Sequence, residues 1–305
     1  MGARSGRLVF VGAVTVDVIA LVSHYPGPDE RVVVQDLVRA GGGPAATAAI
    51  AAARAGHDTA LVAAVGDDDE ATEILDELRA EGVDVTGVVQ EPGTRSASTL
   101  VTVATDPPTR AMCSRPGPSL VGAAPRLVQA MSGASWVHVD HHGWPLVAEV
   151  WPRLWPRPQL SVDDGHVLGD LNLDLGLVDL YVPTLAVLRR RAGRDDMADA
   201  LDWALAANCG AVVATDGGAG SYGQRVGGQL FHEPAVSVDT VSTLGAGDVF
   251  HGALVAALAD GLELPAAVRR ANTTAARSCT ALDGRTAIPR SPDHDRSDFT
   301  LEGAR

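Results

Sequence analysis

Residues 242–254 have the sequence STLGAGDVFHGAL, in which two glycines flank an alanine and a carboxylate, Asp248, follows at once. The apolar run 249–258 predicts a buried helix that ends near Gly261, and the alternation over 234–241 predicts a strand before it. The glycine turn therefore lies at a helix N-terminus, where unpaired N–H groups and the helix dipole favour an anion.

Two interpretations of Asp248 follow from the residues alone. The carboxylate can cap the helix, as Asp often does near a helix start. It can also accept the proton of a hydroxyl that attacks a phosphorus held by the glycine N–H groups. Short glycine motifs occur in many unrelated proteins, so the turn by itself leaves both interpretations open.

Bulk properties narrow the class of protein. The chain has 305 residues, of which 46% are hydrophobic, and a formal net charge of -14. A sizeable core is thus available, and the acidity argues against nucleic acid or an anionic membrane as a partner because both would repel it. All basic residues are Arg, and the lack of Lys excludes a P-loop lysine and Schiff-base chemistry.

Cysteine usage and hydropathy give an expectation about location. Cys113, Cys209 and Cys279 are odd in number and widely spaced, so they predict neither a disulfide framework nor a zinc site. No signal peptide precedes the first predicted strand, and no apolar run reaches the length of a membrane span. We expect a cytoplasmic protein.

The sequence GAGDVF at 245–250 resembles the C-terminal signature of the PfkB/ribokinase family of carbohydrate kinases. Residues 41–47, GGGPAAT, are similar to a second family signature, and the two occur in the family's order. The resemblance extends from Val9 to about Pro289.

This resemblance implies a fold that the residues also favour. Predicted strands and helices alternate along the chain, which is typical of a mostly parallel sheet with helices on both faces. The family implies a ribokinase-like three-layer α/β/α architecture in a single domain over 1–305. A small β lid would come from about 13–40 and 95–113.

The resemblance also implies which residues bind the sugar. Asp17 follows the strand predicted at 8–14 and would accept hydrogen bonds from substrate hydroxyls, although it can also be a plain loop carboxylate. The other implied substrate residues are Gly41, Gly42, Gly43, Thr47 and Arg110. The glycines open a helix predicted over 45–55 and could serve packing alone, and Arg110 could be solvated. The family usually has Asn where Thr47 stands, and Thr has a shorter reach.

Nucleotide-binding residues are implied in the last third of the chain. The sequence from Thr215 through Gly217 to Gly220 resembles the family's Thr-x-Gly-x-x-Gly turn, where backbone groups approach nucleotide phosphates. A plain hairpin turn is the alternative. Asn272 lies on the last predicted helix, 266–280, which borders the adenine pocket in the family.

The implied chemistry is transfer of the γ-phosphoryl group of ATP to a sugar hydroxyl. Asp248 would be the general base, and the amides of Gly245, Ala246 and Gly247 would form an anion hole. Mg²⁺ would be held mainly through the nucleotide phosphates, because the segment 182–185 lacks the carboxylate that many relatives have, and its protein ligands stay unknown. Ser242 replaces an Asp that often contributes to a monovalent-cation site, so activation by K⁺ is doubtful.

Three functions stay open at this point. The first is a sugar kinase, the second a nucleoside kinase of the same fold, and the third a non-catalytic ligand-binding relative. With only four Phe and three Tyr, the sequence is poor in residues for stacking on a nucleobase. Lids of this family often pair across a dimer, so we also expect a homodimer.

Several local expectations complete the prediction. Residues 31–35 look like an exposed strand, and 291–305 a charged tail of low order. Three adjacent Asp at 67–69 predict a helix cap, and the neighbouring His141 and His142 a loop at the sheet edge, because adjacent side chains seldom converge on one metal ion. Packing anchors are predicted at Trp144, Trp151 and Trp155.

Overall fold

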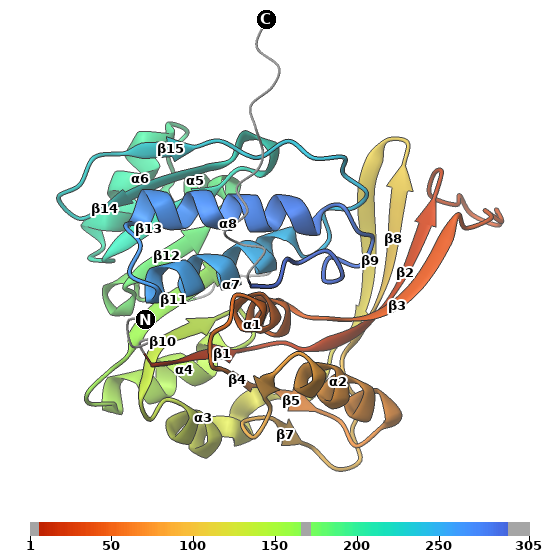
Figure 1. The fold of residues 1–305 in the computed structure, drawn as a ribbon, viewed down its shortest axis with the longest axis horizontal. Coiled ribbons are helices and arrows are strands. Elements are labelled where there is room, and N and C mark those ends of the chain that lie inside the picture. The colour runs from red at the N-terminus through yellow and green to blue at the C-terminus, as the bar shows by residue number, and fades with distance from the viewer. Residues whose placement is uncertain (1–5, 166–171, 292–305) are drawn as a thin grey trace, which may run out of the picture.

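The computed structural model describes residues 6–165 and 172–291. Within these ranges the chain forms a nine-stranded sheet that is parallel except where β13, β14 and β15 pair antiparallel (Figure 1). In spatial order its strands are β15 (Phe231–Glu233), β14 (Ser221–Arg225), β13 (Ala211–Thr215), β12 (Leu180–Pro183), β11 (Gln159–Asp164), β10 (Ala134–Val139), β1 (Arg7–Val11), β4 (Thr59–Val62) and β6 (Val83–Asp84).

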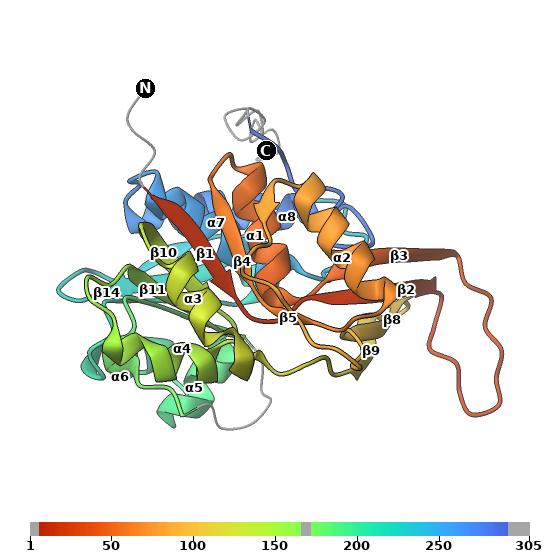
Figure 2. The same cartoon turned by 90° about the horizontal axis from the view of Figure 1, so that it is seen from below.

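Helices cover both faces of this sheet, as Figure 2 shows. Strand β1 sends Leu8 and Phe10 into one core layer and Val9 and Val11 into the other, because successive side chains of a strand point to opposite faces. The first layer includes α1 (Pro44–Arg54), α2 (Asp69–Ala80), α7 (Ala246–Ala259) and α8 (Leu264–Ser278). The second includes α3 (Ala124–Ala130), α4 (Trp144–Val150), α5 (Leu185–Ala192) and α6 (Met197–Ala206). The predicted three-layer fold is confirmed.

A small sheet projects beyond the carboxyl end of β1 (Figure 1). Its order is β3 (Asp36–Gly42), β2 (Thr15–Val22), β8 (Ser98–Thr105) and β9 (Pro108–Arg115), with only the β2–β8 pair parallel. A buried cluster that includes Ile19, Val101 and Leu282 packs its inner face against the C-terminal segment. These strands overlap the ranges 13–40 and 95–113 that the sequence assigns to a lid.

Short elements complete the described chain. They are β5 (Ala64–Val65) with β7 (Val89–Gln90) and the 3₁₀ helices η1 (Leu120–Ala123), η2 (Trp151–Arg153), η3 (Leu175–Leu177) and η4 (Gly217–Ala219). None of the helices in the described ranges combines the length and the apolar character needed to cross a bilayer.

Three local predictions were wrong. The strand expected at 31–35 begins instead at Asp36, and Val33 is 82% exposed. No strand forms at 234–241; the amides of Val241 and Ser242 donate to the carbonyl of Cys279 after α8, which takes this segment out of the sheet.

The third concerns the tryptophans. Trp144 and Trp151 are buried as predicted, but Trp155 is 91% exposed. It lies beyond the end of η2 at Arg153, outside the helical turn that buries Trp151. The tail predicted at 291–305 lies outside the described residues except for Ser291.

Helices α1 and α7 approach each other very closely. Gly252 of α7 faces the backbone of α1, and a methyl group there would lie 2.1 Å from the carbonyl oxygen of Ala48. Alanines make up most of α1 and leave room for this contact. Because both helices begin at the carboxyl edge of the sheet, the contact brings their N-termini together there.

Replacing Gly252 by Ala is expected to lower the free energy of unfolding by at least about 2 kcal/mol, because the methyl group must push α1 and α7 apart. Urea denaturation followed by circular dichroism measures this. Gly122→Ala is the control: an added methyl group meets open space there, so a change below about 0.5 kcal/mol is expected. Equal effects of both substitutions would contradict the close contact.

Candidate active site

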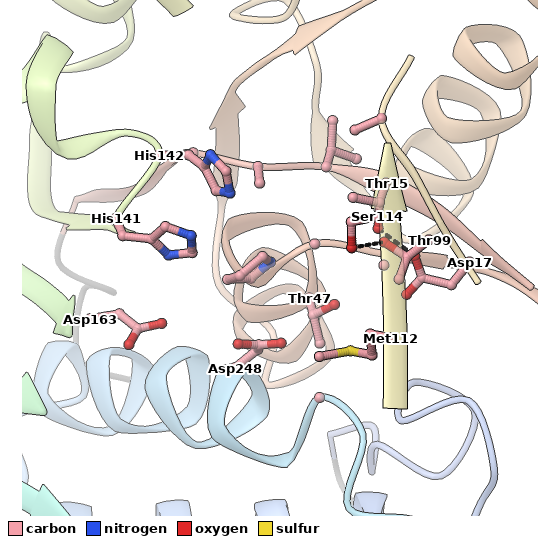
Figure 3. A pocket seen from close by; sticks show the side chains of 18 of the residues that line it. Thr15, Asp17, Thr47, Thr99, Met112, Ser114, His141, His142, Asp163 and Asp248 are labelled. Carbon is pink, nitrogen blue, oxygen red and sulfur yellow. Dashed lines mark hydrogen bonds between the residues drawn. The ribbon is translucent and has the colours of Figure 1, made fainter. Parts of the chain in front are cut away.

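A cavity of about 920 Å³ lies between the carboxyl edge of the large sheet and the inner face of the small sheet. The N-termini of α1 and α7, the loop after β10 and the end of β11 line one side of it. Strands β2, β8 and β9 line the other side (Figure 3). The crevice at the carboxyl ends of parallel strands is where open α/β sheets bind ligands.

Asp248 presents its carboxyl group to this cavity from the first turn of α7, as Figure 3 shows. The helix starts at Gly245, whose φ of 72° is left-handed, and no side chain caps it. Burial raises the pKa of Asp248 to about 7, with further contributions from the nearby carboxylates of Asp163 and Asp140. The uncapped helix start therefore joins amides that favour an anion to a carboxyl group that titrates near neutral pH.

Asp140 joins three elements at the base of the cavity. It is completely buried, and its Oδ2 accepts hydrogen bonds from the amides of Ala13, at 2.8 Å, and Ala45, at 3.2 Å. Its Oδ1 accepts from the amides of His142 and Gly143, both at 2.9 Å. The sequence prediction missed this role, because a carboxylate at a strand end has no local pattern that reveals its four donors.

Polar side chains of the small sheet face the cavity. Asp17 accepts a 2.7 Å hydrogen bond from the hydroxyl of Thr15, and burial raises its pKa. Thr99 and Ser114 are paired across β8 and β9 with their hydroxyls 3.1 Å apart (Figure 3). These two were missed, although the alternation of the predicted hairpin places them on the same face as Val101.

The glycines at 41–43 lie close to neighbouring groups, so an added side chain would require those groups to shift. A Cβ atom on Gly41 would lie 2.0 Å from Oε2 of Glu77, and one on Gly42 would lie 2.1 Å from Oδ2 of Asp17. Gly43 has a φ of 91° and precedes the first turn of α1. These residues line the cavity with bare backbone, as a site that must admit a ligand closely requires.

Arg285 ties together α1, α2 and the end of β3 at one side of the cavity. This side chain is 4% exposed and donates to the Thr47 hydroxyl at 3.0 Å, to the carbonyl of Gly42 at 2.7 Å and to Glu77 at 2.9 Å. Thr47 thus accepts from a fixed donor and can direct its own hydrogen into the cavity that it lines.

Arg110 links the two sides of the cavity. Its guanidinium donates a 2.7 Å hydrogen bond to the hydroxyl of Thr243, two residues before the helix N-cap Gly245. It lines the cavity from β9, so the small sheet contacts the glycine turn directly.

The residues predicted to bind nucleotide differ in whether they line the cavity. Thr215 lines the cavity at the end of β13, whereas Gly217 and Gly220 shape the following turn with φ of 52° and 96°. Asn272 accepts from Ser221 and donates to the carbonyls of Glu233 and Pro234, so its side chain ties α8 to β14 and β15. Nucleotide contact by all four residues stays a prediction.

No protein-only metal site is found among the described residues, where no three His, Cys, Asp or Glu side chains are placed to hold an ion. Thr184, after β12, accepts from the amide of Val187 and caps α5. Ser242 is buried, and its hydroxyl accepts from the amide of Leu244 in the turn before α7. The residues at both departures from the family pattern therefore have structural partners.

The geometry places a carboxyl group and an uncapped helix N-terminus at one cavity, an arrangement that suits an enzyme acting on a small polar ligand. Residues 5–143 and 161–290 match the pfkB family of carbohydrate kinases, and the chain belongs to this family. A ribokinase of Bacillus subtilis is 26% identical over 302 residues, which cover 93% of this chain and 96% of that one. Fructokinase-1 of Oryza sativa is 29% identical over 313 residues, with 92% and 94% covered.

Solved structures show the same fold. A ribokinase from Giardia lamblia has a TM-score of 0.84 at 20% identity, over 95% of this chain and 98% of that one. An Arabidopsis thaliana ribokinase complexed with ribose and ATP has 0.75 at 18%, over 94% and 96%. A Burkholderia thailandensis nucleoside kinase in complex with inosine has 0.78 at 19%, over 95% of each chain.

The chain is therefore an ATP-dependent phosphotransferase that acts on a hydroxyl of a sugar or sugar-like substrate. The family predicted from the two glycine signatures is confirmed.

Replacing Asp140 by Asn is expected to lower the free energy of unfolding by about 3 kcal/mol, because an amide NH₂ would then face two backbone N–H donors in a buried position. Chemical denaturation of both proteins measures the loss. Asp174→Asn is the matched control, since this exposed carboxylate accepts a single backbone hydrogen bond that Asn can also accept. If Asp140→Asn were as stable as that control, the four-amide site would not hold the fold together.

Proposed function

We propose that Asp248 is the general base that deprotonates the sugar hydroxyl while the amides of Gly245, Ala246 and Gly247 bind the transferred phosphoryl group. The observation that carries this is the position of the Asp248 carboxyl group, which faces the cavity beside an uncapped helix N-terminus. Such a helix start stabilises developing negative charge, and a base with a pKa near the working pH is most effective. The sugar lies between Asp248 and the small sheet, within reach of Asp17 and Thr47.

ATP fits the residues on the other side of Asp248. Thr215 and the glycine turn offer hydroxyl and amide groups to phosphates, and the predicted contacts of Gly217, Gly220 and Asn272 complete the nucleotide site. Mg²⁺ would be held through the phosphates, because Asp163, the carboxylate next along the cavity, already bonds His251. When bound, the ion neutralises charge on the phosphate oxygens.

The lining of the cavity favours a sugar over a nucleoside. Among the described residues that line it there is no Phe, Tyr or Trp for a nucleobase to stack on. On the small-sheet side it offers Asp17, Thr99 and Ser114, which suit the hydroxyl groups of a neutral sugar or polyol. A sugar can still accept hydrogen bonds from Arg110, which we propose as a further substrate contact.

We further propose that the chain is one kinase domain over 1–305 in which the small sheet is a lid over the sugar. The hydrogen bond from Arg110 to Thr243 supports this, because it connects that sheet to the catalytic turn. A cytoplasmic location is part of the proposal, since the exposed free thiol of Cys113 persists best in reducing surroundings.

A coupled assay of ADP release over a panel of sugars, polyols and nucleosides tests the substrate class, and we expect turnover with a neutral sugar. Asp248→Asn should then lower kcat by about 10²–10⁴, the contribution of a general base. For the unaltered enzyme, kcat/KM should fall as the pH drops through about 7, because protonation of Asp248 removes the base.

Asp239→Asn is the control for this experiment, because Asp239 is exposed in the segment before the catalytic turn. It should keep full activity. Turnover of Asp248→Asn close to that of Asp239→Asn would remove Asp248 from the role, and nucleosides as the best substrates would overturn the assignment of the sugar.

The outer face of the small sheet supports the expected homodimer. Val18 and Leu100 are neighbours in register on this face, as are Ala20 and Leu37. Leu37 on β3 is 60% and Leu100 on β8 52% exposed, and large apolar side chains this exposed on one face of a small sheet are unusual. We propose that a second copy of the chain covers this face through its own small sheet.

Leu100→Glu is expected to convert the dimer to a monomer, because the interface would then bury an unpaired carboxylate. Size-exclusion chromatography with light scattering measures the mass. Val226→Glu is the matched control, since Val226 is 64% exposed after β14 and far from this face in the fold. A wild-type protein that is monomeric at micromolar concentration would contradict the proposed dimer.

A further inference from the structure

His251 lies one helical turn after Asp248 on α7, and a buried ion pair holds it. Its Nε2 is 3.1 Å from Oδ1 of Asp163, at the end of β11, and both side chains are less than one-tenth exposed. Both residues line the same cavity as Asp248. Among the described residues Nδ1 of His251 has no hydrogen-bond partner, so the contact with Asp163 is the polar contact that orients the ring.

A second histidine packs against this pair without carrying charge. The rings of His138 and His251 have centroids 5.1 Å apart, and Nδ1 of His138 lies 3.1 Å from the hydroxyl of Ser161. Burial and the neighbouring His251 lower the pKa of His138 to about 3, so His138 is neutral at any pH where the enzyme works. It can therefore serve as a control for the loss of a ring.

The charges that face His251 are mainly negative. They come from Asp163 on β11, Asp140 after β10 and Asp248 on α7 itself. Burial lowers the pKa of His251, but these carboxylates outweigh it and the pKa is raised overall. The same cluster holds the pKa of Asp163 well below its usual range, against its burial, through the charge and hydrogen bond of His251.

We propose that His251, kept as an imidazolium by Asp163, is a positioning residue that keeps the Asp248 carboxylate ionised for catalysis. The inference rests on the proposed role of Asp248 as the base. Asp248 faces two buried carboxylates, Asp163 and Asp140, and the cations that oppose them are His251 and Arg285. Arg285 already bonds Glu77, so the charge of Asp163 is offset chiefly by His251.

His251→Gln tests this, because the amide keeps a donor toward Asp163 but removes the charge. In a plot of kcat/KM against pH, the acid limb is the fall in activity at low pH, and its midpoint should shift to a pH about one unit higher. At pH 6 the activity should therefore be about tenfold below wild type, and at pH 9 the two should converge. The double variant Asp163→Asn/His251→Gln removes both charges and should bring the limb back toward the wild-type position. His138→Asn should leave the limb unmoved, since His138 carries no charge.

A direct titration separates this inference from the base assignment. The carboxyl carbon of Asp248, labelled with ¹³C and assigned by its absence in Asp248→Asn, should titrate about one unit higher in His251→Gln than in wild type. If Asp248→Asn stays active while this titration moves, only the base assignment fails. If neither the titration nor the acid limb moves, the inference about His251 is overturned.

A purely structural role gives a different pattern. His251→Gln and the double variant would then lose activity equally at every pH, with the acid limb in place, and this also overturns the inference. Urea denaturation checks folding, and His251→Asn supplies the same comparison if His251→Gln unfolds.

Discussion

The structure depends on one buried carboxylate, Asp140. Removing a carboxylate from water is costly, and here four backbone amides and the start of α1 offset the cost with charge-assisted hydrogen bonds. The amides belong to the segment after β1, to α1 and to the loop after β10, so a single side chain sets the distance between them. Gly12 is required beside it, because a methyl group there would overlap the carboxyl group at about 2 Å.

The same negative charge shapes the chemistry next to it. Asp140 and Asp163 both disfavour the ionised form of Asp248, and burial adds to them, whereas His251 and Arg285 act in the opposite direction. The outcome is a carboxyl group balanced near neutral pH rather than one fully ionised. A carboxyl group so balanced binds a proton more strongly than a solvated Asp and can still release it, which suits the proposed role as general base. Stability of the sheet edge and the proton affinity of Asp248 are thus coupled through charge.

Local patterns predicted most of the elements and the glycine turn before α7. The glycine turn at 245–247 and the small-residue helix after Gly43 have sequence signals that belong to short stretches, and both occur as predicted. Contacts across the fold have no such signal. Arg285 reaches Thr47 and Asp140 reaches Ala13 over long sequence separations, and the segment 234–241 alternates like a strand yet has no partner strand. Periodicity indicates on which face of a strand or helix a side chain lies. The residue that it contacts from a distant part of the chain is determined only by the tertiary structure.

In the small sheet, the alternation of side chains along the strands determines which residues lie on each of its two faces. Asp17, Thr99 and Ser114 occupy one face in register, and Val18, Leu100 and Cys113 occupy the other. Alternation thus separates a polar cavity wall from an apolar outer surface within the same strands. A slip of one residue would exchange the two faces, which would put leucine against a sugar and carboxylate into the proposed dimer contact. Because both faces depend on the same register, the proposed substrate contacts and the proposed dimer contact on this sheet would both be lost if the register changed.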